Sequence, residues 1–486
     1  MAFDPDDITV SAFDAIVVGA GPNGLAAAVT LARAGLSVLL REAEPTIGGG
    51  ARTAQLTLPG FLHDVCSGSH PLGAASPFFA TLDLQSRGLD WVHARIPLAH
   101  PLDGGEAVVL ERDVGVTAAA LRDDGPAWRS LVGPFVASWD RLAGDILGPV
   151  RWPRHPLLMA RFGLSALRAA GPLARSRFTG GHARALFAGL AAHSNLPLDR
   201  AATSAVALVL AAAGHVVGWP VARRGSQSIA DALASAFRAL GGRIELGAPV
   251  ETLDELPGSR AVLLDVAPRE AVRLAGPRLP SAYAHALLTF RHGPGAFKLD
   301  WALSEPIPWL AASCREAATV HVGGTLEEIE SAEGDVSAGR FPEKPFVLLG
   351  QPSLCDDSRA PSGYHTAWAY CHVPTGTFDM TSRIEAQIER FAPGFRDVIV
   401  ERSVLSPAAL EAHDRNLVGG DVTGGANDLW QTLFRPVPRF DPYRTPVPGL
   451  YLCSASTPPG AGVHGMCGHN AAKHVLRDLR LQTAGT

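Results

Sequence analysis

A run of three glycines near the start of the chain has the spacing of a phosphate-binding turn. The run reads Gly19-Ala20-Gly21-Pro22-Asn23-Gly24. In such a run the first glycine makes a tight turn, the second lets the backbone approach a pyrophosphate, and the third lets a helix pack closely on a strand. Glu42 follows 18 residues after the last of these glycines, where a carboxylate can bind ribose hydroxyls and argues against the extra phosphate of NADP. These residue types indicate binding of a dinucleotide, either NAD or FAD.

A second glycine cluster separates these two cofactors. It comes directly after the acidic position, where Glu42 and Ala43 lead to Gly48-Gly49-Gly50-Ala51-Arg52-Thr53. A nicotinamide dinucleotide does not need this cluster. A flavin dinucleotide has a longer body, and glycines let the backbone wrap around it while Arg52 supplies positive charge. We therefore expect non-covalently bound FAD in contact with residues 49–53, and the alternative is an ordinary flexible loop.

A second GxGxxG run lies close to the end of the sequence. It reads Gly460-Ala461-Gly462-Val463-His464-Gly465 and is followed by Met466. The 486-residue sequence leaves no room after it for another strand and acidic residue, so we expect no separate NAD(P)H domain and favour oxygen or a quinone as electron acceptor. A helix over 468–479 would point its N-terminus at the flavin and stabilise negative charge there. We assign Gly462, Val463, Gly465 and Met466 to the cofactor site.

Short apolar runs supply the elements that must position these motifs. Residues 15–18 and 37–40 predict two strands, with a helix over 25–34 between them. This is the βαβ unit that places a pyrophosphate at the helix N-terminus. The patterns further along predict a helix over 226–240 and strands over 243–246, 261–266 and 450–453.

Four segments together resemble the phytoene desaturase-like branch of the flavin amine oxidase superfamily, and the resemblance covers nearly the whole chain. The first and last segments are typical of the superfamily and the middle two of the branch. The segments are Asp14 to Thr53, Gly218-Trp219-Pro220 with Gly225-Ser226-Gln227, Phe297-Lys298-Leu299-Asp300-Trp301, and Pro448 to Ala472.

The resemblance implies an α/β fold in which a Rossmann-type FAD-binding domain, of the glutathione reductase type, is interrupted by an inserted α+β substrate domain. It places residues 12–75, 215–280 and 440–486 in the FAD domain. Residues 76–214 and 281–439 then form the substrate domain, with a mainly helical insertion over 115–214. In similar proteins the position of Val250 would lend its backbone to the adenine.

Lys298 and three histidines are the candidate catalytic residues. Lys298 lies on an expected strand over 296–303, and superfamily relatives often place a lysine near flavin N5 through a water. The alternative for Lys298 is an exposed strand lysine. His464 stands in the C-terminal glycine turn near the expected flavin edge, and His70 lies in Ser69-His70-Pro71 beyond the GGG segment.

The third histidine, His372, belongs to an aromatic strand over 366–372. Alternation places Trp368, Tyr370 and His372 on one face. They could form the wall of an apolar pocket. The alternative is a core face that contains one hydrogen-bonded histidine.

Hydride transfer to a flavin needs a positioned substrate and a dry pocket more than a strong base. We expect an oxidoreductase that dehydrogenates, and so desaturates, a small apolar substrate such as an isoprenoid or polyene. Two alternatives stay open. A redox-neutral flavin-dependent isomerase would shift a double bond, and an amine oxidase would need an aromatic cage, for which Trp430 and Tyr451 lie near suitable segments.

Composition restricts the partners and the compartment. The formal net charge of −5 gives no general attraction to nucleic acid. The six cysteines form no CxxC pair, so we expect reduced thiols and no metal site. Residues 1–12 have no basic region or long apolar run, which predicts a cytoplasmic protein without a secretory signal. The uncharged run 201–222 fits a buried helix and turn better than a membrane span.

One basic segment departs from the overall charge. Between Asp145 and Asp199 there is no acidic residue, and Arg154, Arg161, Arg168 and Arg175 recur at every seventh position. On a helix they would form a narrow stripe, interrupted at Gly171-Pro172. Such a segment with apolar neighbours could lie on the inner face of an anionic membrane. The alternative is that its arginines pair with acids elsewhere in the chain or in a second subunit of a homodimer. The seven basic residues are Arg151, Arg154, Arg161, Arg168, Arg175, Arg177 and Arg184.

Overall fold

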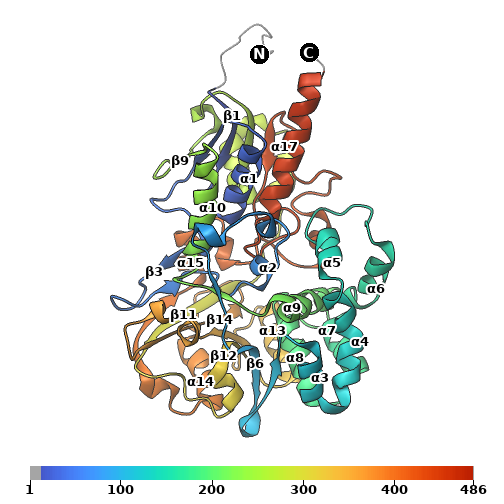
Figure 1. The fold of residues 1–486 in the computed structure, drawn as a ribbon, viewed down its shortest axis with the longest axis vertical. Coiled ribbons are helices and arrows are strands. Elements are labelled where there is room, and N and C mark those ends of the chain that lie inside the picture. Colours follow the sequence, from blue (N-terminus) through green and yellow to red (C-terminus); the bar gives the residue numbers. More distant parts are fainter. Residues whose placement is uncertain (1–11, 485–486) are drawn as a thin grey trace.

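The computed structural model describes residues 12–484 and contains two large β-sheets with helices around them (Figure 1). Residues 1–11 lie outside the described part, and so does most of the segment on which the prediction about a secretory signal rests. The strand that precedes the first glycine motif lies in the upper sheet of Figure 1, and the aromatic strand expected over 366–372 lies in the lower one.

The first sheet is parallel throughout. Its side chains alternate between two cores, with Ala15 and Val17 on one face and Ile16 and Val18 on the other, as expected when helices cover both faces. The expected α/β fold with a Rossmann-type sheet is confirmed. The strands, in spatial order, are β16 (Leu450–Leu452), β10 (Ser259–Leu264), β1 (Phe13–Val18), β2 (Val38–Arg41) and β9 (Arg243–Glu245).

Three helices cover one face of the parallel sheet and two cover the other. Helix α17 packs so closely on α1 that a Cβ on Gly468 would lie 1.7 Å from the backbone oxygen of Asn23. The first face carries α1 (Pro22–Arg33), α10 (Gln227–Ala239) and α17 (Met466–Ala484), and the second carries α11 (Pro268–Ala275) and α12 (Ser281–Leu288). The helices expected over 25–34, 226–240 and 468–479 are confirmed, although α17 begins two residues earlier than expected.

The second sheet is mixed and has seven strands. Among the strands that the structure describes in this sheet, only β12 and β6 pair in parallel. One face packs on α14 (Thr381–Phe391) through apolar side chains, and the other faces α8 (Gly181–Ala192) and α13 (Leu326–Ser337). The strand order is β15 (Ile399–Leu405), β11 (Gly295–Leu303), β14 (His365–Val373), β13 (Val347–Gly350), β12 (Ala317–Val322), β6 (Ile96–Leu102) and β7 (Glu106–Leu110).

A group of helices extends from the side of the second sheet (Figure 1). The uncharged run at 201–222 contains a turn at 201–202 and α9 (Thr203–Val217), a mostly buried helix, as expected. No helix within residues 12–484 has the length and apolarity needed to cross a membrane. These helices are α3 (Val114–Ala120), α4 (Gly125–Val136), α5 (Trp139–Ile146), α6 (Pro156–Ala166), α7 (Ala170–Arg177), α8 (Gly181–Ala192) and α9 (Thr203–Val217).

The expected arginine stripe is not continuous. The helical break lies between the end of α6 and the start of α7, whereas Gly171 and Pro172 are inside the first turn of α7. Backbone N–H groups in the first turn of a helix have no partner within the helix, so a proline, which lacks this N–H, is tolerated there. Arg175 is paired with Glu330 and Glu327 on α13, so the pairing alternative holds for this residue.

A buried ion cluster joins segments that lie far apart in the sequence. The Arg359 guanidinium donates from Nη1 to Asp64 at 2.9 Å and from Nε to Asp356 at 2.8 Å, and all three side chains are fully buried. Asp64 also accepts from the Ser226 backbone at the start of α10. The cluster therefore fixes the short sheet β3–β4 (Thr53–Ala54, His63–Asp64) against β8 (Val221–Ala222), β5 (Trp91–Val92) and α10.

Candidate dinucleotide and substrate site

One cavity of about 1120 Å³ runs from the glycine loops of the parallel sheet to the inner face of the mixed sheet. This volume is slightly larger than the usual range for pockets that hold one drug-sized ligand. The Rossmann end is formed by loops after β1, β2 and β10, and the other end by β13, β14, α6 and α9. Three short helices, α2 (Pro71–Ala74), α15 (Pro407–His413) and α16 (Leu429–Phe434), contribute to its walls.

The first glycine motif forms a turn with no room for side chains at its three glycines. Gly19 has φ of +99°, and a Cβ on it would lie 2.8 Å from the backbone oxygen of Asp265. A Cβ on Gly21 would lie 2.9 Å from an Asp265 carboxylate oxygen, and one on Gly24 would lie 2.0 Å from the Gly19 oxygen. The structure thus shows the tight turn, the open backbone and the close helix packing that a pyrophosphate site requires.

The second glycine cluster lies against the first. Gly48 has φ of +120°, and a Cβ on Gly49 would lie 3.2 Å from the Cα of Gly21. The Arg52 side chain folds back, donating from Nε to the Gly49 oxygen at 3.1 Å. Both loops therefore form one wall, which fits a ligand that runs past the first motif.

Glu42 closes the adenosine end of this wall. Its carboxylate accepts hydrogen bonds from the Ala20 backbone at 2.7 Å and from the Glu44 backbone at 3.0 Å. Burial raises the pKa of Glu42 despite these bonds. The carboxylate is held where the motif requires an acceptor for ribose hydroxyls.

Asp265 is the main functional residue that sequence reasoning missed. It follows β10 and accepts a hydrogen bond from the Gly24 backbone at 2.7 Å, so it caps the N-terminal turn of α1. Burial, together with Asp414 and Glu42, raises the pKa of Asp265 to about 8. The carboxyl ends of parallel strands meet at the ligand site. The position of Asp265 near the end of the strand expected over 261–266 could therefore have identified it from the sequence.

Most residues predicted to bind the cofactor line the cavity. Four do not: Gly24 packs on the Gly19 backbone, Gly465 packs on Ala26 and Phe79, Met466 is buried at the start of α17, and Thr53 binds Asp64. The residues that line it are Gly19, Gly21, Pro22, Asn23, Glu42, Ala43, Gly49, Gly50, Ala51, Arg52, Val250, Gly462 and Val463.

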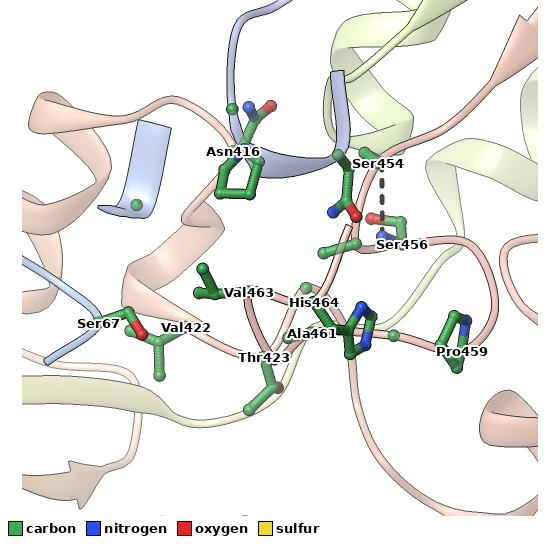
Figure 2. Close-up of a pocket in the computed structure, with 18 of the residues that line it drawn as sticks. Ser67, Asn416, Val422, Thr423, Ser454, Ser456, Pro459, Ala461, Val463 and His464 are labelled. Carbon is green, nitrogen blue, oxygen red and sulfur yellow. Dashed lines mark hydrogen bonds between the residues drawn. The ribbon is translucent and has the colours of Figure 1, made fainter. Parts of the chain in front are cut away.

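His464 lies at the junction of the two ends of the cavity. Figure 2 shows the cavity lining from Ser67 and Val422 on one side to His464 on the other, with Thr423 and Val463 between them. Its Nδ1 accepts from the Met466 backbone at 3.1 Å, so the proton is on Nε2. Burial lowers the pKa of His464 to about 4. The side chain is therefore a neutral hydrogen-bond donor at neutral pH.

Lys298 is buried beside the cavity and does not line it. Only 2% of the residue is exposed, so the alternative of an exposed strand lysine is wrong. Its Nζ is paired with Asp300, which also lies 3.5 Å from His63 Nδ1. Directly across the strand pair from Lys298 is Tyr370, which does line the cavity.

The structure places His70 and His372 outside the cavity lining. His70 Nε2 donates to Ser226 Oγ at 2.7 Å, because that hydroxyl donates its own proton to the Ser67 carbonyl. His372 Nδ1 contacts the buried Glu333 carboxylate at 2.9 Å. Both rings are thus fixed by protein partners.

The aromatic strand forms part of the wall at the far end. Trp368 and Tyr370 share one face of β14, as predicted, and their rings stack at 6.4 Å with an 11° interplanar angle. Both line the cavity. Trp430 and Tyr451, considered for an aromatic cage, do not, because Trp430 is largely exposed and Tyr451 bonds to Asp478.

The mouth of the cavity carries exposed apolar side chains. Trp152 and Leu157 are each 87% exposed and Leu164 is 77% exposed, around lining residues from α5 and α6. Arg154, Arg161 and Arg168 are exposed on the same segment. We call residues 150–168 the rim segment.

Comparisons with known proteins agree with this geometry. The model of the NAD(P)-binding Rossmann-like domain matches residues 17–81. The chain is 28% identical to the rat pyridine nucleotide-disulfide oxidoreductase domain-containing protein 2, covering 96% of this chain and 94% of the relative. It is 27% identical to the phytoene dehydrogenase of Streptomyces griseus, covering 92% of each chain.

A solved structure supports the fold over the same length. Putrescine oxidase bound to putrescine superposes with a TM-score of 0.60 at 18% identity, covering 96% of this chain and 99% of that one. The chain is therefore an oxidoreductase with a Rossmann-type dinucleotide-binding domain, related to phytoene desaturases and sharing the fold of the flavin amine oxidases.

Proposed function

We propose that the protein is an FAD-dependent enzyme that dehydrogenates a neutral, largely apolar substrate to form a carbon–carbon double bond. The observation that carries this proposal is the distribution of charge along the cavity. The charged lining residues lie at the Rossmann end or at the mouth, for example Glu42, Asp265 and Arg151. The described residues that line the far end include no acid, lysine or arginine. A charged substrate group there would be desolvated without a counter-ion, which is costly.

FAD suits the double glycine wall better than NAD does. The wall extends past the first motif through Gly49 and Gly50 and continues to the C-terminal turn at Gly462. FAD, when bound, would supply the hydride acceptor. The chain's own residues then bind and orient the substrate and exclude water from it. Oxygen or a quinone is the electron acceptor that we propose.

His464 and Lys298 have different places in this proposal. The neutral His464 ring can donate from Nε2 to a group in the cavity. Lys298 can act only through its neighbours Asp300 and Tyr370, as a positioning residue. If the Lys298→Met variant retains flavin and its flavin is reduced at the wild-type rate, Lys298 has no role in the reaction beyond its ion pair with Asp300.

Anaerobic mixing with candidate substrates tests the reaction. An apolar alkene or polyene precursor should bleach the flavin absorbance and give a product lighter by two hydrogens. A product of unchanged mass without lasting bleaching would instead show an isomerase. Bleaching by amines alone would show an amine oxidase, which the aromatic pair Trp368 and Tyr370 could serve by cation–π contact.

The cofactor is tested separately. The purified protein should be yellow and should release one FAD per chain on denaturation. Gly21→Asp should remove the colour, because its side chain would meet the Asp265 carboxylate and occupy the pyrophosphate position. A wild-type protein that is colourless and cannot be reconstituted with FAD would contradict the proposal.

We also propose that the rim segment rests on an anionic membrane surface. It combines exposed apolar side chains with exposed arginines beside the cavity mouth, which suits an interface of anionic lipid and a lipid-soluble substrate. The wild type should sediment with vesicles that contain phosphatidylserine at low salt, and not with neutral vesicles. Changing Arg154, Arg161 and Arg168 to Glu should abolish this binding. Binding that survives those changes, or its absence in the wild type, would remove the proposal.

A further inference from the structure

Two side chains at the far end of the cavity each have a polar atom that makes no hydrogen bond within residues 12–484. Tyr370 lies on β14, and His193 directly follows α8. Both line the cavity and are partly exposed to it. Within residues 12–484 the Tyr370 hydroxyl makes no hydrogen bond, and His193 uses only its Nε2, which lies 2.9 Å from His321 Nε2. His193 Nδ1 and Tyr370 Oη are thus left for an occupant of the cavity.

The His193 ring is held in place from behind. It packs on Trp219 at 5.9 Å and on His321 at 5.0 Å between ring centroids. His321 is in turn fixed between Trp219, Phe346 and the small residue Gly189, where a Cβ would lie 2.7 Å from His321 Nδ1. A side chain that is fixed by packing and by a hydrogen bond to a neighbouring side chain is suited to specific recognition of a ligand.

Tyr370 is fixed on the mixed sheet. Its ring stacks on Trp368, and it lies 5.7 Å from the His372 ring. Tyr370 pairs with Leu348 on β13, and Leu348 pairs with His321 on β12, so the hydrogen-bond partner of His193 lies two strands away from Tyr370 on the same face of the sheet. Tyr370 and His193 therefore flank the same end of the cavity, one from the sheet and one from the helices.

The group that these two atoms can bind is neutral. Burial lowers the pKa of His193 to about 3, so its ring carries no charge at neutral pH and offers no ion pair to a carboxylate. The described lining of this end also lacks an acid for an ammonium group. A neutral imidazole that shares Nε2 with a second imidazole carries either a proton or a lone pair at Nδ1. A hydroxyl group can bond either form, and a carbonyl can bond the protonated one.

We propose that this end of the cavity binds a neutral oxygen function, a hydroxyl or a carbonyl, at one end of an otherwise apolar substrate, through His193 Nδ1 and the Tyr370 hydroxyl. The proposal rests on the proposed function, because it names the substrate class of that same cavity. A pure hydrocarbon of the same length would leave both polar atoms buried without partners. Such unpaired groups typically reduce affinity by about tenfold or more.

Competitive binding to the flavin-loaded protein tests the proposal. N-phenyl-1-naphthylamine is the fluorescent apolar probe, and n-decane, 1-decanol, 2-decanone and decanoate are the competitors. The readout is the ratio of the displacement constants for an oxygenated competitor and for decane. In this ratio a change of the cavity that affects both competitors equally cancels. His193→Phe and Tyr370→Phe should each shift this ratio towards decane by about tenfold. The exposed residues His285 and Tyr364 provide matched controls as His285→Phe and Tyr364→Phe.

Each outcome decides the proposal. A shift for decanol alone identifies a hydroxyl, and a shift for decanone identifies a carbonyl. An unchanged ratio in a folded Tyr370→Phe protein, or tightest binding of decanoate, would overturn it. Because no flavin reduction enters the readout, the oxygen site can be supported even if no substrate ever bleaches the flavin. Conversely, bleaching by a pure hydrocarbon with an unchanged ratio would support the dehydrogenase and reject the oxygen site.

Discussion

Replacement of Asp265 by asparagine should stabilise the protein freed of its dinucleotide, and increasingly so as the pH rises. Asp265 is buried and accepts from the Gly24 backbone. Burial and the neighbouring acids raise its pKa from 3.8 to about 8. The folded chain therefore holds a proton that the unfolded chain loses at much lower pH. Stability from this group is complete below the unfolded pKa and is lost as the pH rises towards 8.

The magnitude follows from the size of this shift. One pKa unit corresponds to about 1.4 kcal/mol. Between pH 5 and pH 8 the wild type should therefore lose roughly 3 to 4 kcal/mol of unfolding free energy through Asp265 alone. Asparagine has nearly the same shape, does not titrate, and keeps an oxygen for the Gly24 N–H. The variant should lack this loss.

Urea unfolding of the dinucleotide-free protein, followed by fluorescence of its nine tryptophans at pH 5, 6, 7 and 8, measures the difference. Asp231→Asn removes an exposed carboxyl on α10 and is the control, which should follow the wild type at every pH. A pH profile of Asp265→Asn that runs parallel to the wild type would refute the reasoning. Lower stability of the variant at pH 8 would refute it as well.

Three further substitutions test the structure. Gly24→Ala should abolish dinucleotide binding, because its Cβ would lie 2.0 Å from a backbone oxygen, whereas Gly133→Ala in α4, which meets no atom within 4 Å, should leave the flavin spectrum unchanged. Arg359→Met should lower the unfolding free energy by about 3–5 kcal/mol because Asp64 is left buried without a counter-ion, and a loss below about 1 kcal/mol in chemical denaturation would contradict the role of the cluster. His464→Ala should retain FAD but slow flavin reduction in stopped-flow experiments, and reduction at the wild-type rate would exclude His464 from the site.

The local sequence was sufficient to predict the dinucleotide wall. A glycine turn, the strand before it and the helix after it are neighbours in sequence, and their conformations follow from φ freedom and apolar periodicity over a few residues. The motif at Gly19 and the cluster at Gly49 could therefore be identified without tertiary information. The shared face of Trp368 and Tyr370 followed from the two-residue period of a strand in the same way.

Burial and partnership were decided only by the tertiary structure. Lys298 and Asp300 are two residues apart on a strand, and nothing local shows that both faces of that strand are covered. Arg175 meets Glu330 from a helix more than 150 positions away, so the basic segment by itself could not show which arginines are free. Likewise Asp265 reaches Gly24, and His193 reaches His321, only because separate elements pack together. Short-range patterns fix backbone conformation, whereas the charge state and the hydrogen-bonding atoms of a site depend on contacts between residues that the chain brings together from a distance.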